Sequence, residues 1–301
     1  MALSRRVLLA AVAGSALAGC RPSARGGVGD PSPALSATAT PAATAATVTP
    51  AATAAPAATA TPAARREPTR AELVDRYGGT APKEWGLEVA GVITALPDGE
   101  RATALTFDAC GGPGGNGYDA DLIDFLRARS VPATLFLNAR WIAANPDVFE
   151  RLAADPLFEI GNHGTVHRPL SVSGRSAYGI AGTRDVGEVY DEVVGNAHQL
   201  AGLLGHPVRF FRSGTAHYDD VATRMVADLG ERVAGFTVNG DGGATLSASE
   251  VRQEVAAAPP GSIVIGHMNH PGGGTAPGVA AAVPGLLAAG RRFVRLSDVL
   301  G

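Results

Sequence analysis

The chain has 301 residues, a formal net charge of -3, and a composition that is 46% hydrophobic and 18% charged. Lys83 is the only lysine and there is no run of basic residues, which excludes a nucleic-acid-binding protein that depends on a basic surface. Only two cysteines are present, Cys20 and Cys110, and they argue against a framework of disulfide bonds.

The first twenty residues are predicted to be an export signal, with a basic pair at Arg5 and Arg6. The apolar run that follows, residues 7–18, is too short to span a bilayer as a stable helix. Residues 4–9 resemble a twin-arginine signal, and the Leu-Ala-Gly-Cys that ends at Cys20 resembles a bacterial lipobox. We expect Cys20 to carry a lipid anchor that holds the protein to the membrane of the cell envelope. The alternative is an ordinary cleaved signal with an incidental cysteine.

The next segment, residues 21–68, consists mainly of alanine, threonine and proline. It has too few large apolar side chains to offset the entropy cost of ordering, so we expect a disordered tether. The remainder, residues 69–301, is long enough for one α/β domain with a sizeable core.

Strand and helix patterns alternate along this domain after a lead-in helix at residues 70–77. The predicted strands are residues 102–108, 133–137, 157–161, 208–212, 233–238, 262–266 and 293–296. The predicted helices are residues 118–129, 142–154, 183–204, 219–229, 248–257 and 279–289. For the helix at residues 142–154, Asn145-Pro146 is an alternative start. Repeated βα units predict a parallel sheet covered by helices.

Two motifs place reactive side chains directly after predicted strands. Asp108 lies in Leu-Thr-Phe-Asp-Ala-Cys-Gly-Gly, and His163 and His167 lie in Glu-Ile-Gly-Asn-His-Gly-Thr-Val-His. The i, i+4 spacing of the histidines puts both imidazoles on one side of a single turn. A carboxylate and two imidazoles at the ends of neighbouring strands can hold a divalent metal and activate water.

Residues 106–110 and 163–167 resemble the first two motifs of the NodB-homology polysaccharide deacetylases, carbohydrate esterase family four. The resemblance implies an α/β fold, a distorted (β/α) barrel, with catalytic groups at the carboxyl ends of the strands. It also implies that Asp108 is the general base. His163 and His167 are then ligands of a divalent metal, with zinc as the first expectation.

One position departs from the family pattern. Ala109 stands where the family has a second aspartate that completes the metal ligands. Three explanations are open: Asp119 supplies the third ligand, Asp108 itself binds the metal, or the site binds metal weakly or not at all. We expect Asp119 to be the third ligand, because both histidines are retained. A cysteine such as Cys110 is a possible soft ligand, but it is expected in a loop where the direction of its side chain cannot be predicted, and we interpret it as a small buried hydrophobic residue.

The segment Phe-Phe-Arg-Ser-Gly resembles the third family motif, in which Arg212 orients the carboxylate of the base. An Arg212–Asp108 pair would keep Asp108 ionised. His217 and Tyr218 follow as candidate groove residues, with an ordinary loop as the equal alternative.

The last two motifs concern the general acid. The resemblance makes His267 the acid that protonates the leaving amine, and makes Asp241 the carboxylate that orients it. Gly242 replaces a family tryptophan at this point, and His270 competes with His267 for the role of acid.

The predicted function is metal-dependent hydrolysis of N-acetyl groups on a cell-wall or extracellular polysaccharide of the N-acetylglucosamine type. This would be a hydrolase acting on carbon–nitrogen bonds other than peptide bonds. The first alternative is a metal-independent amide or O-acetyl ester hydrolase of the same fold. The second is a carbohydrate-binding envelope protein with a degenerate site.

Overall fold

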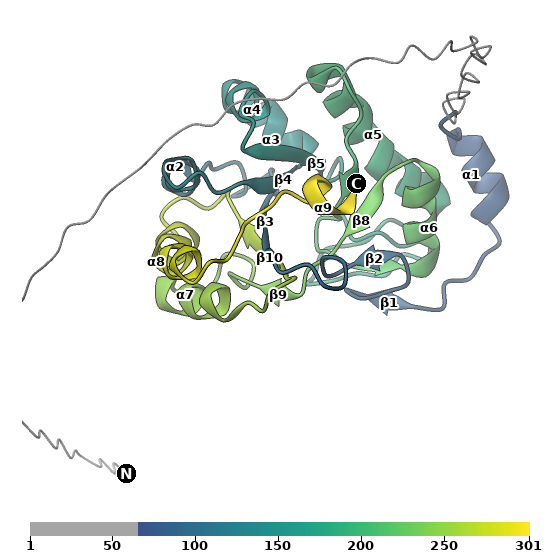
Figure 1. The fold of residues 1–301 in the computed structure, drawn as a ribbon. Helices are drawn as coiled ribbons and strands as arrows, with labels where there is room; N and C mark the ends of the chain where they lie inside the picture. Colours follow the sequence, from purple (N-terminus) through teal and green to yellow (C-terminus); the bar gives the residue numbers. More distant parts are fainter. Residues whose placement is uncertain (1–65) are drawn as a thin grey trace, which may run out of the picture. The chain divides into compact units, whose positions relative to one another are not determined.

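The computed structural model of the protein describes residues 66–301 (Figure 1). The predicted export signal, Cys20 with its expected lipid anchor, and nearly all of the predicted tether lie outside the described residues. Within residues 66–301, no helix combines the length and the apolarity needed to cross a bilayer.

A parallel sheet of eight strands forms the centre of the described domain. In spatial order the strands are β2 (Val92–Ile93), β8 (Arg232–Ala234), β6 (Phe210–Phe211), β5 (Phe158–Asn162), β4 (Ala133–Leu137), β3 (Ala104–Ala109), β10 (Ile263–His267) and β9 (Val238–Asn239). Every residue of β3 and β4 is buried. A strand covered on both faces is expected to be apolar throughout, and this is why these segments read as continuous apolar runs.

Helices cover the outer side of the sheet (Figure 1). They are α2 (Ala120–Ala128), α3 (Ala139–Ala144), α4 (Pro146–Ala153), α5 (Val186–Leu204), α6 (Asp220–Asp228), α7 (Ala248–Ala257) and α8 (Thr275–Ala288). The first helix, α1 (Arg70–Tyr77), begins with a capping box between Thr69 and Glu72 and packs against α5.

The short connection between β8 and β9 shows how strongly the sheet curves. These strands lie near opposite ends of the strand order, yet only residues 235–237 separate them. The Gly235 amide donates to the Ile93 carbonyl of β2, and the Thr237 amide donates to the Ile263 carbonyl of β10. Three residues reach both ends only if the sheet curls on itself. The predicted distorted (β/α) barrel is therefore confirmed as a curled half-barrel.

Three predicted elements differ in kind from the structure, and one small sheet was not predicted. The helix expected at residues 142–154 is split into α3 and α4, because Pro146 starts a new helix. The strand expected at residues 233–238 is divided into β8 and β9. The last expected strand, residues 293–296, makes only an isolated bridge from Phe293 and is followed by α9 (Ser297–Leu300). A small second sheet, β1 (Trp85–Gly86) against β7 (Tyr218–Asp219), was not predicted.

Candidate active site

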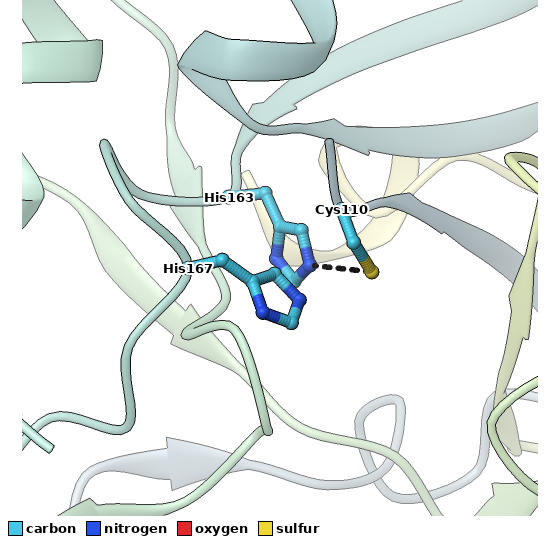
Figure 2. Close-up of side chains that lie close together, drawn as sticks. All are labelled: Cys110, His163 and His167. Carbon is cyan, nitrogen blue, oxygen red and sulfur yellow. Dashed lines mark hydrogen bonds between the residues drawn. The ribbon is translucent and has the colours of Figure 1, made fainter. Parts of the chain in front are cut away.

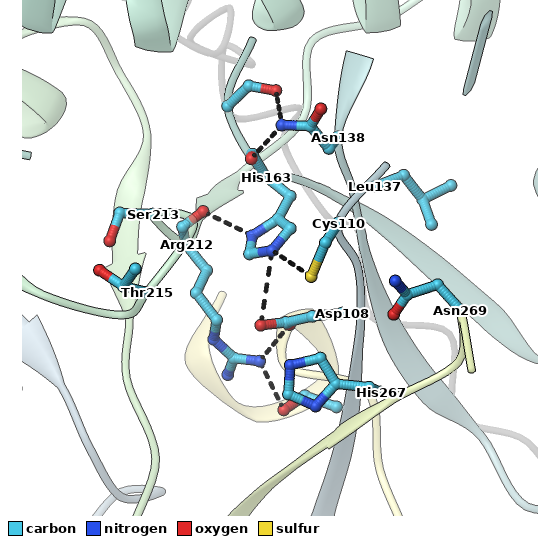
Figure 3. Close-up of polar contacts among 12 residues, drawn as sticks. Asp108, Cys110, Leu137, Asn138, His163, Arg212, Ser213, Thr215, His267 and Asn269 are labelled. Carbon is cyan, nitrogen blue, oxygen red and sulfur yellow. Dashed lines mark hydrogen bonds and ion pairs between the residues drawn. The ribbon is translucent and has the colours of Figure 1, made fainter. Parts of the chain in front are cut away.

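The carboxyl ends of adjacent strands bring the predicted catalytic residues together. His267 lies opposite Asp108 in the register of β10 and β3. His163 follows the last residue of β5, and Arg212 follows the last residue of β6. Figure 3 shows these four side chains gathered at one edge of the sheet. The predicted placement at strand ends is thus confirmed for each of them, as barrel geometry requires.

Asp108 is held by a buried ion pair. Arg212 Nη1 lies 2.8 Å from Asp108 Oδ1, and both side chains are buried. The guanidinium also donates to the Ala234 and Gly235 carbonyls and lies over the Phe136 ring. Burial raises the pKa of Asp108, but the charge of Arg212 and the nearby His163 and His267 imidazoles together outweigh burial, and the net pKa is below its usual value. Asp108 is therefore an ionised, oriented carboxylate that can accept a proton.

His267 is oriented by a second carboxylate. Its Nδ1 lies 3.0 Å from Asp241 Oδ1, and Asp241 Oδ2 also accepts from the His267 amide and from Thr275 Oγ1. Burial lowers the pKa of His267, but the hydrogen bond to Asp241 and the charge of Asp241, together with the interaction with Cys110, outweigh burial, and the net pKa is well above the usual value. This favours the protonated imidazole that a general acid needs. In the structure it is His267 that contacts Asp241. The ring of His270 lies next to that of His267, with the two ring centroids 6.5 Å apart.

Two histidines and a cysteine form the third group of the site. His163 Nδ1 lies 2.9 Å from the Arg212 carbonyl, which can only accept, so this nitrogen carries the proton. His163 Nε2 then carries no proton. It lies 3.9 Å from Cys110 Sγ and 3.7 Å from Asp108 Oδ2. One ligand atom each from Cys110, His163 and His167 lie within 4.8 Å of one another. Figure 2 shows both imidazoles turned toward the sulfur.

The loop between the two histidines is anchored by Glu192 of α5. Its carboxylate accepts the amides of Val166 and Arg168. Gly164 adopts a φ of 76°, and a Cβ there would lie 2.4 Å from Glu192 Oε1. His167 itself has a φ of 66°, which is uncommon for a non-glycine residue and is typical of functional sites. The sequence patterns did not single out Glu192, because nothing marks an acidic residue on the buried face of a helix.

Comparisons with known proteins agree with this geometry. Residues 95–234 match the profile of a family described as polysaccharide deacetylase. A chitooligosaccharide deacetylase from Bradyrhizobium sp. (strain ANU 289) is 26% identical over 178 residues, which is 58% of this chain and 74% of that protein. Residues 95–234 are thus similar to polysaccharide deacetylases, the family that the sequence motifs predicted.

Solved structures show the same fold at low sequence identity. A carbohydrate esterase family 4 pseudoenzyme from Bacillus anthracis has a TM-score of 0.59 and 20% identity, over 70% of this chain and 69% of that chain. A family 4 carbohydrate esterase from Bacillus subtilis has a TM-score of 0.57 and 19% identity, over 76% of this chain and 87% of that chain. The polysaccharide deacetylase fold is thus shared with an enzyme and with a pseudoenzyme.

The donor set of this domain fits a divalent metal. His167 Nε2 is buried and has no hydrogen-bond partner among the described residues, as expected for a ligand nitrogen. Burial raises the pKa of Cys110, but hydrogen bonds with His163 and the other nearby imidazoles lower it well below the usual value. A thiolate and two neutral imidazoles are ligands that zinc prefers. Three protein ligands leave a fourth position open, as in catalytic zinc sites.

The structure does not bring Asp119 into this group, contrary to our expectation for the third ligand. Asp119 caps the amino end of α2, where Oδ1 accepts the Leu122 amide. Cys110, interpreted from the sequence as a small hydrophobic residue, lies there instead. Side chains alternate between the faces of a strand, so residue 110 is expected on the same side as Asp108, and Ala109 on the other. Ala109 indeed packs in the hydrophobic core.

Proposed function

We propose that this domain is a metal-dependent hydrolase that removes N-acetyl groups from a polysaccharide of the N-acetylglucosamine type. The single observation that carries the proposal is the meeting of three groups at one sheet edge. These are the Asp108–Arg212 pair, the His267–Asp241 pair, and the cluster of Cys110, His163 and His167. Together they provide a base, an acid and a set of metal ligands.

Each group has a distinct role in the proposed reaction. A divalent ion, with zinc as the first candidate, held by Cys110, His163 and His167 would polarise the acetyl carbonyl and lower the pKa of water. Asp108 accepts the proton of the attacking water while Arg212 holds its carboxylate in place. His267 donates its proton to the leaving nitrogen. The products are acetate and a free amino sugar.

We also propose that the domain acts at the bacterial cell envelope. The export signal, the lipobox ending at Cys20 and the Ala/Thr/Pro-rich segment that follows support this location. A lipid-anchored domain on a tether would meet cell-wall or exported polysaccharide within the reach of that tether.

Cobalt substitution combined with acetate release tests the proposal on the full chain. We expect about one equivalent of bound metal, and loss of both metal and acetate release in His163→Ala. The Co²⁺ form should show a sulfur-to-cobalt charge-transfer band that disappears in Cys110→Ser. The matched control is Cys20→Ser, which removes the only other cysteine sulfur of the sequence and should keep the band. Acetate release that persists after complete metal removal would overturn the proposal.

One observation favours a second candidate, a metal-independent hydrolase. Cys110 Sγ beside the free His163 Nε2 is also the arrangement of a thiol nucleophile and its base. Cys110 would then attack the acetyl carbonyl, release the amine and form an acetyl thioester that water hydrolyses to acetate. Chelator-resistant turnover that is lost in Cys110→Ser would support this candidate. Sugar binding without acetate release would instead support a carbohydrate-binding protein.

A further inference from the structure

We propose that Trp85, Tyr178 and His217 form an aromatic platform that binds a second sugar ring of the polysaccharide, next to the ring that carries the scissile acetyl group. The inference rests on the proposed function, because it assigns a neighbouring unit of the same polymer. None of these residues belongs to the acid, the base or the metal-binding cluster described above.

Trp85 and Tyr178 each contact the ring of His217, which lies between them. The Tyr178 ring meets His217 edge to face, with centroids 5.1 Å apart, and the Trp85 ring lies 5.8 Å from His217. The Arg175 guanidinium lies 5.3 Å from the centre of the Trp85 ring. His217 Nδ1 lies 2.8 Å from the Thr215 carbonyl, and this hydrogen bond fixes the imidazole between its two neighbours.

Tyr178 is held on the surface at a conformational cost. It lies in a tight turn in which Ala177 and Ile180 exchange both backbone hydrogen bonds. Tyr178 has a φ of 52° and Gly179 a φ of 76°. Turns of this kind favour asparagine or glycine at both central positions. The side chain is nevertheless 76% exposed, so core packing does not explain why an aromatic residue occupies this strained position.

The platform adjoins the loop that carries His167. Gly214 packs so closely against this loop that a Cβ at Gly214 would lie 2.4 Å from the His167 carbonyl carbon. Three residues further along the chain, the His217 carbonyl accepts the amide of Leu170. Backbone contacts therefore connect the platform directly to the segment that holds a candidate metal ligand.

The chemistry of the platform suits a pyranose ring. Such a ring has an apolar face of C–H groups that packs on aromatic side chains, and a rim of hydroxyl groups that hydrogen-bond with polar neighbours. Trp85 and Tyr178 offer the apolar surface, and Arg175, which is exposed, offers donors for hydroxyl oxygens. A neutral polymer of N-acetylglucosamine units matches both features. The platform then predicts a preference for oligomers long enough to reach it.

Steady-state kinetics on the full chain, with N-acetylglucosamine oligomers of two and five units, tests this inference. Tyr178→Asn keeps a residue that the turn favours, so folding should be retained. We expect its KM for the longer oligomer to rise about tenfold, the usual scale for losing an aromatic contact, with an unchanged KM for the dimer and an unchanged kcat. Trp85→Leu should act in the same direction. The matched control is Leu203→Ser, which removes an exposed apolar side chain of α5. This variant should leave KM and kcat unchanged for both oligomers.

The outcomes separate the platform from the proposed function. Equal changes in KM for both oligomers, or none, would overturn the platform while the deacetylase assignment stands. If the wild-type protein releases no acetate, the proposed function fails, and calorimetric titration with the longer oligomer decides the platform alone. Binding that weakens about tenfold in Tyr178→Asn then supports it, and binding that is absent or unchanged overturns it.

Discussion

Two buried carboxyl groups of this domain have opposite electrostatic environments. Asp108 is paired with Arg212, and its pKa is lowered. Glu231, just before β8, accepts one hydrogen bond from Asn162, and its Oε2 has no hydrogen-bond partner among the described residues. Burial raises the pKa of Glu231 to about 8. Burial alone therefore favours the neutral carboxyl, and a buried cation keeps a carboxylate charged. Only the charged group can act as a base at neutral pH.

Removal of the Arg212 guanidinium should have the largest effect on stability and activity. Arg212→Met leaves the Asp108 carboxylate buried without its partner, and we expect a loss of about 3 to 5 kcal/mol in the free energy of unfolding, together with loss of acetate release. Urea unfolding at neutral pH measures the first effect. Asp108→Asn in the same chain removes the uncompensated charge, so the double variant should lose less than the sum of the two single variants. Additive losses would show that the two side chains do not stabilise each other.

The converse experiment removes the carboxyl group of Glu231. Glu231 is ionised in the unfolded chain above its usual pKa of 4.5 but remains protonated in the folded domain up to about 8. The unfolded state therefore binds fewer protons across that window, and this group lowers stability progressively as the pH rises through it. Glu231→Gln cannot ionise, so we expect little change near pH 4 and a gain of up to about 5 kcal/mol near pH 9. Thermal unfolding at both pH values measures the difference, and a gain that does not depend on pH would contradict this explanation.

Strand-end placement made much of the candidate site predictable from the sequence. Parallel strands share one carboxyl edge, so a reactive residue after each apolar run identifies a common site. The resemblance to the family motifs identified Asp108, His163, Arg212 and His267, and their predicted places at strand ends supported a common site independently. Cys110 was set aside as a ligand because it was expected in a loop, where the direction of a side chain cannot be predicted. In the structure it follows β3 directly and joins His163 and His167, the side that strand alternation predicts from Asp108.

Other features had no usable pattern in the sequence. The pairing of β1 with β7 involves two residues on each strand, too few to show an alternation of apolar and polar residues. Trp85 therefore could not be placed beside His217 before the structure was known. The curl of the sheet was expected from the family resemblance and not from a local pattern, because β8 and β9 are joined by residues 235–237 and resemble one continuous strand in the sequence.

The smallest expected effect is a shift in the pH dependence of activity, caused by changes around the candidate general acid His267. His267 must be protonated to act, so activity should be present below its raised pKa and lost as the pH rises through that value. Asp241→Asn removes the charge that raises the pKa, and the alkaline limb of kcat/KM should move to lower pH by about one to two units. Thr275→Val, which removes only the hydroxyl donor to Asp241, is the matched control and should shift the limb less. His270→Ala should leave the limb in place. If His270→Ala moves it and Asp241→Asn does not, the acid is His270, and the carboxylate on His267 has a structural role alone.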